Sequence, residues 1–122
     1  MERFLATSGA ILGAVAVILG AFAAHGLKTR LEPDLLAVFE TGARYQMYHA
    51  LALFAAAWLA SRGAVTEAGW AGRLFILGTV LFSGSLYALA LTGIRGLGVI
   101  TPLGGIAFIA GWVALVLGAR KI

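Results

Sequence analysis

Four long stretches of this chain are dominated by apolar residues, and shorter polar segments separate them. A helix needs about 20 apolar residues to cross the hydrocarbon core of a bilayer. The pattern predicts membrane helices at about residues 4–24, 42–60, 74–91 and 102–118. Little of the chain remains for anything else, so residues 1–122 are predicted to form a single membrane domain.

Small residues recur every three or four positions in the first and fourth predicted helices. Bulky residues such as Ile11 and Ile18 fall on the opposite side of the first helix. Small seams let helix backbones approach closely in lipid. We expect these seams to be used inside one bundle, or to hold a second copy or another membrane protein. They consist of Gly9, Gly13, Ala16, Gly20 and Ala23, and of Gly104, Ala107, Gly111, Ala114 and Gly118.

The connection after the first helix contains Pro33, which favours a helix break before it. Leu35, Leu36 and Phe39 then share one side of a short helix. We interpret residues 35–39 as an interfacial helix, separate from the second membrane helix that starts near Gly42. The predicted fold class is an all-α integral membrane protein: a four-helix transmembrane bundle with a short interfacial helix in the first loop.

Composition and charge support the membrane class. Hydrophobic residues make up 61% of the chain and charged residues 11%, whereas a soluble domain has about 25% charged residues. The net charge of +4 lies at the predicted helix ends, where the lipid bilayer and its anionic headgroups are the expected partner. No basic run with interleaved aromatic residues indicates nucleic-acid binding. The absence of cysteine excludes disulfides and thiolate metal sites.

Basic residues also predict the orientation. Four helices place both termini on one side, with Arg3, Arg62, Arg73, Arg120 and Lys121. The other side has four basic residues: Lys28, Arg30, Arg44 and Arg95. Cytoplasmic loops carry the excess of Lys and Arg. We therefore expect an integral protein of the bacterial inner (plasma) membrane with both termini in the cytoplasm.

The second predicted helix is polar in its first half. On a wheel of 100° per residue, Tyr45 and His49 share a side with a stripe of alanines. Bulky residues such as Leu51 and Trp58 fall on the opposite side. Polar residues within membrane helices are costly and usually face the interior of a bundle. We expect the polar and alanine side to face inward and the bulky side to face lipid.

The first and third connections lie on the same side of the predicted bundle, so several polar residues are expected to gather there. Glu40 and Arg44 are separated by four positions, which favours an ion pair. The candidate ligand-binding residues are His25, Glu40, Arg44, Tyr45, Gln46, His49 and Arg95.

Three interpretations of this cluster are open. The residues can staple the first connection to the bundle, bind an anionic headgroup, a quinone or a small acid, or hold a metal or haem through His25 and His49. Two histidines alone are a weak metal signal, so neither a metal nor a cofactor is predicted. No GxSxG or HExxH motif and no paired carboxylates occur, and an enzyme is not predicted. His49 is predicted to be neutral and buried against the first helix or first connection, with a partner at each ring nitrogen.

Three motifs resemble one known family. GAFAAHGL at residues 20–27, TGARYQMYHALAL at 41–53 and ITPLGGIAFIAGW at 100–112 are similar to the small membrane proteins grouped as domain of unknown function 423. Transmembrane protein 256 of animals is also similar. The resemblance implies a four-helix membrane protein without an established activity. It also implies that His25, Tyr45, Gln46 and His49 are motif positions of the family.

These observations lead to two hypotheses about function. The first is a non-enzymatic accessory or scaffold protein that binds a protein partner or lipid. The alternative is a binder or carrier of a small anionic or quinone-like ligand at the face formed by His25, Arg44 and His49.

Overall fold

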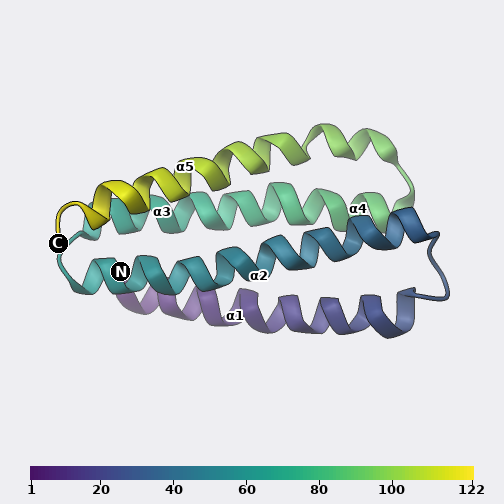
Figure 1. Ribbon diagram of the computed structural model, residues 1–122, viewed down its shortest axis with the longest axis horizontal. Coiled ribbons are helices and arrows are strands. Elements are labelled where there is room, and N and C mark those ends of the chain that lie inside the picture. The colour runs from purple at the N-terminus through teal and green to yellow at the C-terminus, as the bar shows by residue number, and fades with distance from the viewer.

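The computed structural model describes residues 1–122, and these form helices joined by short turns (Figure 1). The helices make four rods that run alternately in opposite directions. The first and third rods each contain a π-helical turn, and a short 3₁₀ turn leads into the fourth. In chain order the elements are α1 (Glu2–Phe22), the π-helical η1 (Ala23–Leu27), α2 (Pro33–Ser61), α3 (Val65–Gly78), the π-helical η2 (Thr79–Ser83), α4 (Gly84–Thr92), the 3₁₀-helical η3 (Arg95–Val99) and α5 (Thr101–Ala119).

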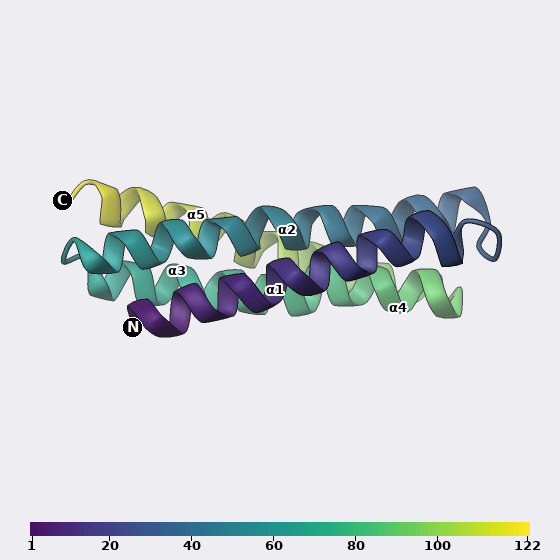
Figure 2. The same cartoon turned by 90° about the horizontal axis from the view of Figure 1, so that it is seen from below.

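Both chain termini lie at one end of the bundle, together with the turn between α2 and α3 (Figures 1 and 2). We call this the terminal end. The opposite end, which we call the connection end, holds the α1–α2 and α4–α5 connections. α1 packs along α2, α3 packs along α5, and α2 also packs against α3 and α4. By contrast, α2 and α5 touch each other only sparingly.

Three rods are long and apolar enough to cross a membrane, and they cover residues 2–27, 65–92 and 95–119. The predicted all-helical membrane class is therefore confirmed. α2 has 29 residues, which is length enough, but it is not among the segments that apolarity identifies. The polar residues in its N-terminal half, from Glu40 to His49, account for this difference from the prediction of four equivalent spans.

The predicted separate interfacial helix is wrong, because α2 is continuous from Pro33 to Ser61. Proline is tolerated in the first turn of a helix, where its missing N–H needs no partner. Phe39 is only 1% exposed, and its ring lies 4.8 Å from that of Tyr87, so packing holds the first turns in place. At Gly42 an added Cβ would lie 2.8 Å from the Tyr87 ring. This glycine therefore marks a close helix contact and not the start of a helix.

The third rod begins earlier than predicted, at Val65, and the expected loop at residues 61–73 is mostly helical. Gly63, with φ of +102°, supplies the left-handed turn that joins α2 to α3. Ala64, Ala68 and Ala71 are buried in the core. Charged residues favour a loop by composition alone, but here they lie on the exposed side of a helix, as Arg73 does over the Trp70 ring at 5.4 Å.

The predicted small seams lie at helix contacts within the bundle, except at Gly20, where an added Cβ would meet nothing within 4 Å. An added Cβ at Gly9 would lie 2.8 Å from the carbonyl oxygen of Ala50, so α1 and α2 are in close contact there. On α5 the five seam residues are all buried. A Cβ at Gly111 would lie 2.5 Å from the Phe75 ring. The bulky side of α1 faces outward, as expected, with Ile18 65% exposed.

The core has two parts. The larger part lies toward the terminal end and contains Leu5, Leu53 and Phe75, which are all fully buried. The smaller part lies at the connection end, where Leu27, Phe39 and Ala90 meet. His49 of α2 packs against Phe75 and Phe108 of the larger part, on the side where α2 and α5 are in sparse contact.

Candidate functional site

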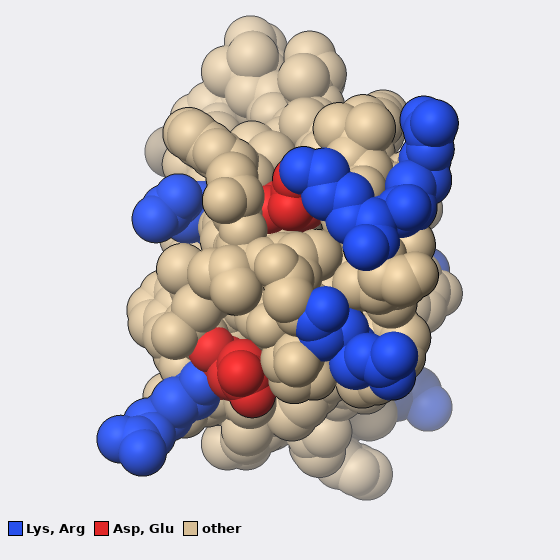
Figure 3. All heavy atoms as spheres, turned by 90° about the vertical axis from the view of Figure 1, so that its left-hand side faces the viewer, with Lys and Arg blue, Asp and Glu red and all other residues tan.

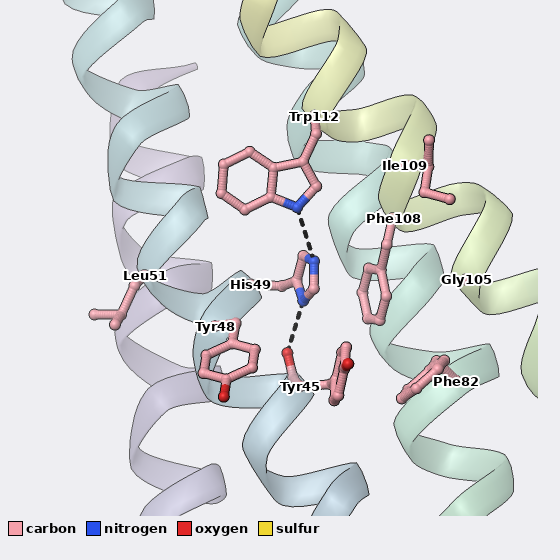
Figure 4. Close-up of a pocket in the computed structure, with 9 residues that line it drawn as sticks. All are labelled: Tyr45, Tyr48, His49, Leu51, Phe82, Gly105, Phe108, Ile109 and Trp112. Carbon is pink, nitrogen blue, oxygen red and sulfur yellow. Dashed lines mark hydrogen bonds between the residues drawn. The ribbon is translucent and has the colours of Figure 1, made fainter.

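His49 lies near the middle of α2 and is bonded through both ring nitrogens (Figure 4). Nδ1 lies 2.7 Å from the carbonyl oxygen of Tyr45, and the Trp112 indole N–H donates to Nε2 at 3.1 Å. An indole N–H can only donate and a carbonyl can only accept. The ring must therefore be the neutral tautomer with its hydrogen on Nδ1. The predicted partner at each ring nitrogen is confirmed.

The surroundings of His49 are aromatic. Its ring stacks on that of Phe108, with centroids 3.5 Å apart and planes inclined by 5°. The Phe75 ring lies 5.3 Å away, and His49 is 4% exposed. The prediction that His49 is buried against the first helix or first connection is wrong, because it faces α3 and α5. A helical wheel gives the side of a helix that turns inward but not which neighbouring helix it meets.

A groove of about 660 Å³ lies beside His49, between α2 and α5. It opens on the flank of the bundle, since its rim residues Tyr48 and Ile109 are 48% and 66% exposed. Phe108 and Trp112 project from α5 toward His49, with Phe82 beyond Phe108 (Figure 4). The lining residues are Tyr45, Tyr48, His49, Leu51, Phe82, Gly105, Phe108, Ile109 and Trp112.

The polar character of the groove comes from two phenols. The hydroxyl groups of Tyr45 and Tyr48 make no hydrogen bond to any residue of the chain, and both residues are exposed. No Asp, Glu, Lys or Arg lines the groove. Chemically, the groove offers aromatic faces and hydroxyl donors, which suit a flat apolar molecule with acceptor oxygens better than a free anion.

Gln46 faces a different neighbour from His49. Its side-chain amide donates to the carbonyl oxygen of Leu12 at 2.9 Å, and its carbonyl accepts the Tyr87 hydroxyl at 2.7 Å. Beside it, the Ser83 hydroxyl donates to the Gly42 carbonyl at 2.7 Å. These bonds join α2 to α1 and to the third rod. No buried side-chain nitrogen or oxygen in the chain lacks a partner.

The remaining predicted residues lie toward the connection end. His25 is exposed in η1, and Glu40 and Arg44 are exposed on α2. The predicted Glu40–Arg44 ion pair is not formed, as a solvent-exposed pair gains little from holding two long side chains together. Arg95 instead pairs with Asp34 at 2.8 Å. The hydrogen bond from Arg95 holds the pKa of Asp34 below its ordinary value.

The structure thus divides the predicted cluster into three parts. Tyr45 and His49 belong to the groove, Gln46 belongs to the contacts with α1 and α4, and His25, Glu40, Arg44 and Arg95 lie at the connection end. His25 and His49 do not share a site. No group of three or more metal-ligating side chains occurs in the chain.

Sequence reasoning missed the α5 side of the groove. Phe108 and Trp112 are one helical turn apart, beside the small seam of their helix. That spacing was the available signal, but only the fold shows that His49 stacks on one and bonds to the other.

The fold and the side-chain arrangement define a small all-helical membrane protein with a lateral aromatic groove. Residues 19–105 match the family described as "Protein of unknown function (DUF423)", and the chain belongs to this family. The resemblance seen in the three sequence motifs is therefore confirmed.

Three relatives are similar over nearly their whole length. The UPF0382 membrane protein YwdK of Bacillus subtilis is 53% identical over 117 residues, which cover 93% of each chain. The UPF0382 membrane protein SSP2132 of Staphylococcus saprophyticus is 48% identical, with 93% of this chain and 94% of the relative covered. The UPF0382 inner membrane protein YgdD of Escherichia coli is 40% identical, with 99% and 92% covered. No solved structure matches the chain.

Proposed function

We propose that this protein is a non-catalytic four-helix transmembrane protein that binds a lipid-soluble ring molecule with carbonyl oxygens, a quinone-like ligand, in the groove between α2 and α5. The observation that carries the proposal is the pair of phenol hydroxyls, of Tyr45 and Tyr48, that line an aromatic groove without a partner in the chain. A ligand carbonyl would accept from these hydroxyls while its ring packs against the aromatic walls.

The proposal treats α2 as a fourth span. The stretch from Tyr45 to Ser61 contains no Asp, Glu, Lys or Arg, and as a helix it rises about 25 Å, close to the hydrocarbon thickness of about 30 Å. Its polar residues Gln46 and His49 are buried and bonded within the bundle. Mean hydropathy alone does not identify such a helix as a membrane span, because it counts polar groups that do not face lipid.

This placement puts the groove at membrane depth and opens it to the bilayer. The relative from Escherichia coli is named an inner membrane protein, and we assign this chain to the corresponding membrane. We assign both termini to the cytoplasm, because the terminal end, where Lys and Arg gather (Figure 3), has five basic residues and the connection end has four.

The absence of catalysis in this proposal follows from the chemistry of the groove. His49 has both ring nitrogens committed to protein groups, so it has no free nitrogen to act as a general base. No carboxylate lines the groove. The ligand is therefore held or carried, and not transformed.

The test uses Trp112 as a reporter. In a Trp58→Phe, Trp70→Phe background, Trp112 is the single tryptophan. We expect a short-tailed 1,4-benzoquinone to quench its fluorescence in nanodiscs with saturation, and an alkylbenzene of the same tail to compete poorly. Tyr45→Phe should weaken quinone binding about fivefold, the value of one neutral hydrogen bond.

A blocking variant completes the test. At Gly105 an added Cβ would meet nothing within 4 Å, so Gly105→Leu should fold and fill the groove. Gly84→Leu is the matched control, because Gly84 also has open space but does not line the groove. Saturable quenching that survives Gly105→Leu unchanged would overturn the proposal. Equal binding of the alkylbenzene would also overturn it, and would indicate a site for acyl chains.

The second candidate is an accessory or scaffold protein that binds a protein partner or lipid. It is favoured by a separate observation: the buried polar groups are satisfied within the chain and need no ligand. Apart from Gly20, the small seams are used inside the bundle, so a partner would contact mainly the bulky outer faces. This candidate predicts that Gly105→Leu leaves the cellular function intact, whereas ligand binding predicts its loss.

A further inference from the structure

A small cleft lies between α1 and α2, toward the connection end and away from the groove. It measures about 250 Å³ and is lined by Ala16, Gly20, Glu40, Ala43 and Arg44. An added Cβ at Gly20 would meet nothing within 4 Å. The small residues of α1 that meet α2 closely at Gly9 therefore leave a gap at Gly20, and the two charged residues of α2 flank that gap.

The two charges in the cleft are not neutralised by the protein. Glu40 and Arg44 are one helical turn apart, yet they form no ion pair with each other or with any other residue. The nearby Asp34 and Arg95, by contrast, are paired. The cleft thus presents one carboxylate and one guanidinium, each free to bind a group of opposite charge.

The order of these charges along α2 matches one class of ligand. Arg44 lies next to the uncharged stretch that begins at Tyr45, and Glu40 lies one turn, about 6 Å, farther toward the connection end. In phosphatidylethanolamine the phosphate adjoins the glycerol, and the ammonium lies farther from the hydrocarbon. Arg44 is therefore at the depth of the phosphate, and Glu40 is at the depth of the ammonium.

We propose that this cleft is a binding site for a phosphate–ammonium zwitterion, the headgroup of phosphatidylethanolamine, with Arg44 on the phosphate and Glu40 on the ammonium. Guanidinium groups bind phosphate through charge-assisted hydrogen bonds. A primary ammonium donates to a carboxylate, whereas the quaternary ammonium of phosphatidylcholine has no hydrogen to donate. The site rests on α2 as a membrane span but not on the α2–α5 groove.

Native mass spectrometry of the protein released from nanodiscs tests the site. The nanodiscs contain equal amounts of phosphatidylethanolamine, phosphatidylcholine and phosphatidylglycerol. We expect retained phosphatidylethanolamine to exceed each of the others by about fivefold, the scale of one exposed charge pair. Glu40→Gln should remove this preference, and Arg44→Gln should lower the retention of all three lipids, which share the phosphate. Arg30→Gln should keep the preference, because this exposed basic residue does not line the cleft.

The charge order is tested by the double variant Glu40→Arg, Arg44→Glu, which keeps the net charge but reverses the order. It should lose the preference for phosphatidylethanolamine. Gly20→Leu, which fills the gap in a helix that tolerates leucine, should lose it as well, and Ala21→Leu on the exposed side of α1 should not. The Gly20→Leu result is informative even if the double variant fails to fold.

A competition with excess O-phosphoethanolamine separates two sources of the same chemistry. Retention of the lipid assigns the site to the membrane headgroup, and displacement assigns it to a soluble zwitterion. Equal retention of the three lipids by the unmodified protein, or a preference that survives charge reversal, would overturn the proposal. Neither result would bear on quinone binding at Trp112, so the two proposals fail separately.

Discussion

α2 has two flanks that are built in opposite ways. Against α1 the contact is close, because Gly9 and Gly13 carry no side chain of their own and an added Cβ at Gly9 would lie 2.8 Å from the Ala50 carbonyl oxygen. Against α5 the contact is sparse, and the aromatic rings of His49, Phe108 and Trp112 stand between the helices. One flank is closed and the other forms a groove.

The difference shows how side-chain size sets the separation of two packed helices. Membrane helices gain stability from packing and hydrogen bonds and not from leaving water, so small residues bring two backbones together. Rings hold the backbones apart but satisfy polar atoms across the gap, as the His49–Trp112 bond does. The small residues of α5 pack against α3, and its aromatic residues lie toward α2. A groove results between α2 and α5.

The largest expected effect on stability comes from adding a side chain at the close contact between α1 and α2. Gly9→Leu places a side chain against the Ala50 backbone, which cannot move without shifting α2. We expect a loss of about 3 kcal/mol in the free energy of unfolding, measured by denaturant titration in mixed micelles. Gly105→Leu, on the second flank, should change it by less than about 1 kcal/mol. Similar losses for the two variants would contradict the contrast between the flanks.

The second prediction concerns the ring that spans the groove. His49→Ala removes the stack on Phe108 and leaves the Trp112 N–H without its acceptor. We expect a loss of about 2–3 kcal/mol in the free energy of unfolding. His49→Gln keeps a donor and an acceptor and should recover about 1 kcal/mol.

The comparison of these two variants separates hydrogen bonding from stacking. If His49→Gln is as unstable as His49→Ala, the ring stack carries the whole effect. If both variants keep the stability of the unmodified protein but lose quinone quenching, His49 serves the ligand and not the fold.

A smaller effect is expected from the polar contact on the closed flank. Gln46→Leu removes the bond to the Leu12 carbonyl and leaves the Tyr87 hydroxyl without its acceptor. We expect a loss of about 1 kcal/mol, and a coupling of about 0.6 kcal/mol with Tyr87→Phe in a double-mutant cycle. Strict additivity of the two substitutions would show that the Gln46–Tyr87 bond contributes nothing measurable.

The sequence predicted the features that depend on local periodicity. The seams of α1 and α5 and the outward face of α2, with Leu51 and Trp58, follow from helical spacing and are found as expected. Helix ends were predicted less well. The break before Pro33 is found as predicted, but α2 continues without the expected break between Phe39 and Gly42, and Arg73 lies on a helix surface. In both places tertiary packing, through Phe39 and Ala71, outweighs a local polar signal.

The groove could be predicted only in part. The polar side of α2 pointed to Tyr45 and His49, and their inward direction was correct for His49. The partners on α5 could not be predicted, because they depend on how α2 and α5 are rotated and spaced in the bundle. The same reason explains why Gln46 and His49, three positions apart, contact different helices.

The smallest expected effect lies outside both flanks, at the Asp34–Arg95 pair that joins the first turn of α2 to the α4–α5 connection. Its hydrogen bond lowers the pKa of Asp34 below the ordinary 3.8. The pair therefore stabilises the fold at neutral pH, and its contribution is lost as the pH falls from 3.8 through the lower folded-state pKa. Thermal unfolding in micelles should show a slight drop over that acid range, absent in Asp34→Asn, and high salt should reduce it. Both side chains are more than half exposed, so the drop should be smaller than the effect of Gln46→Leu. A loss from Asp34→Asn as large as that from His49→Ala would mean that the connections, and not the flanks of α2, hold the bundle together.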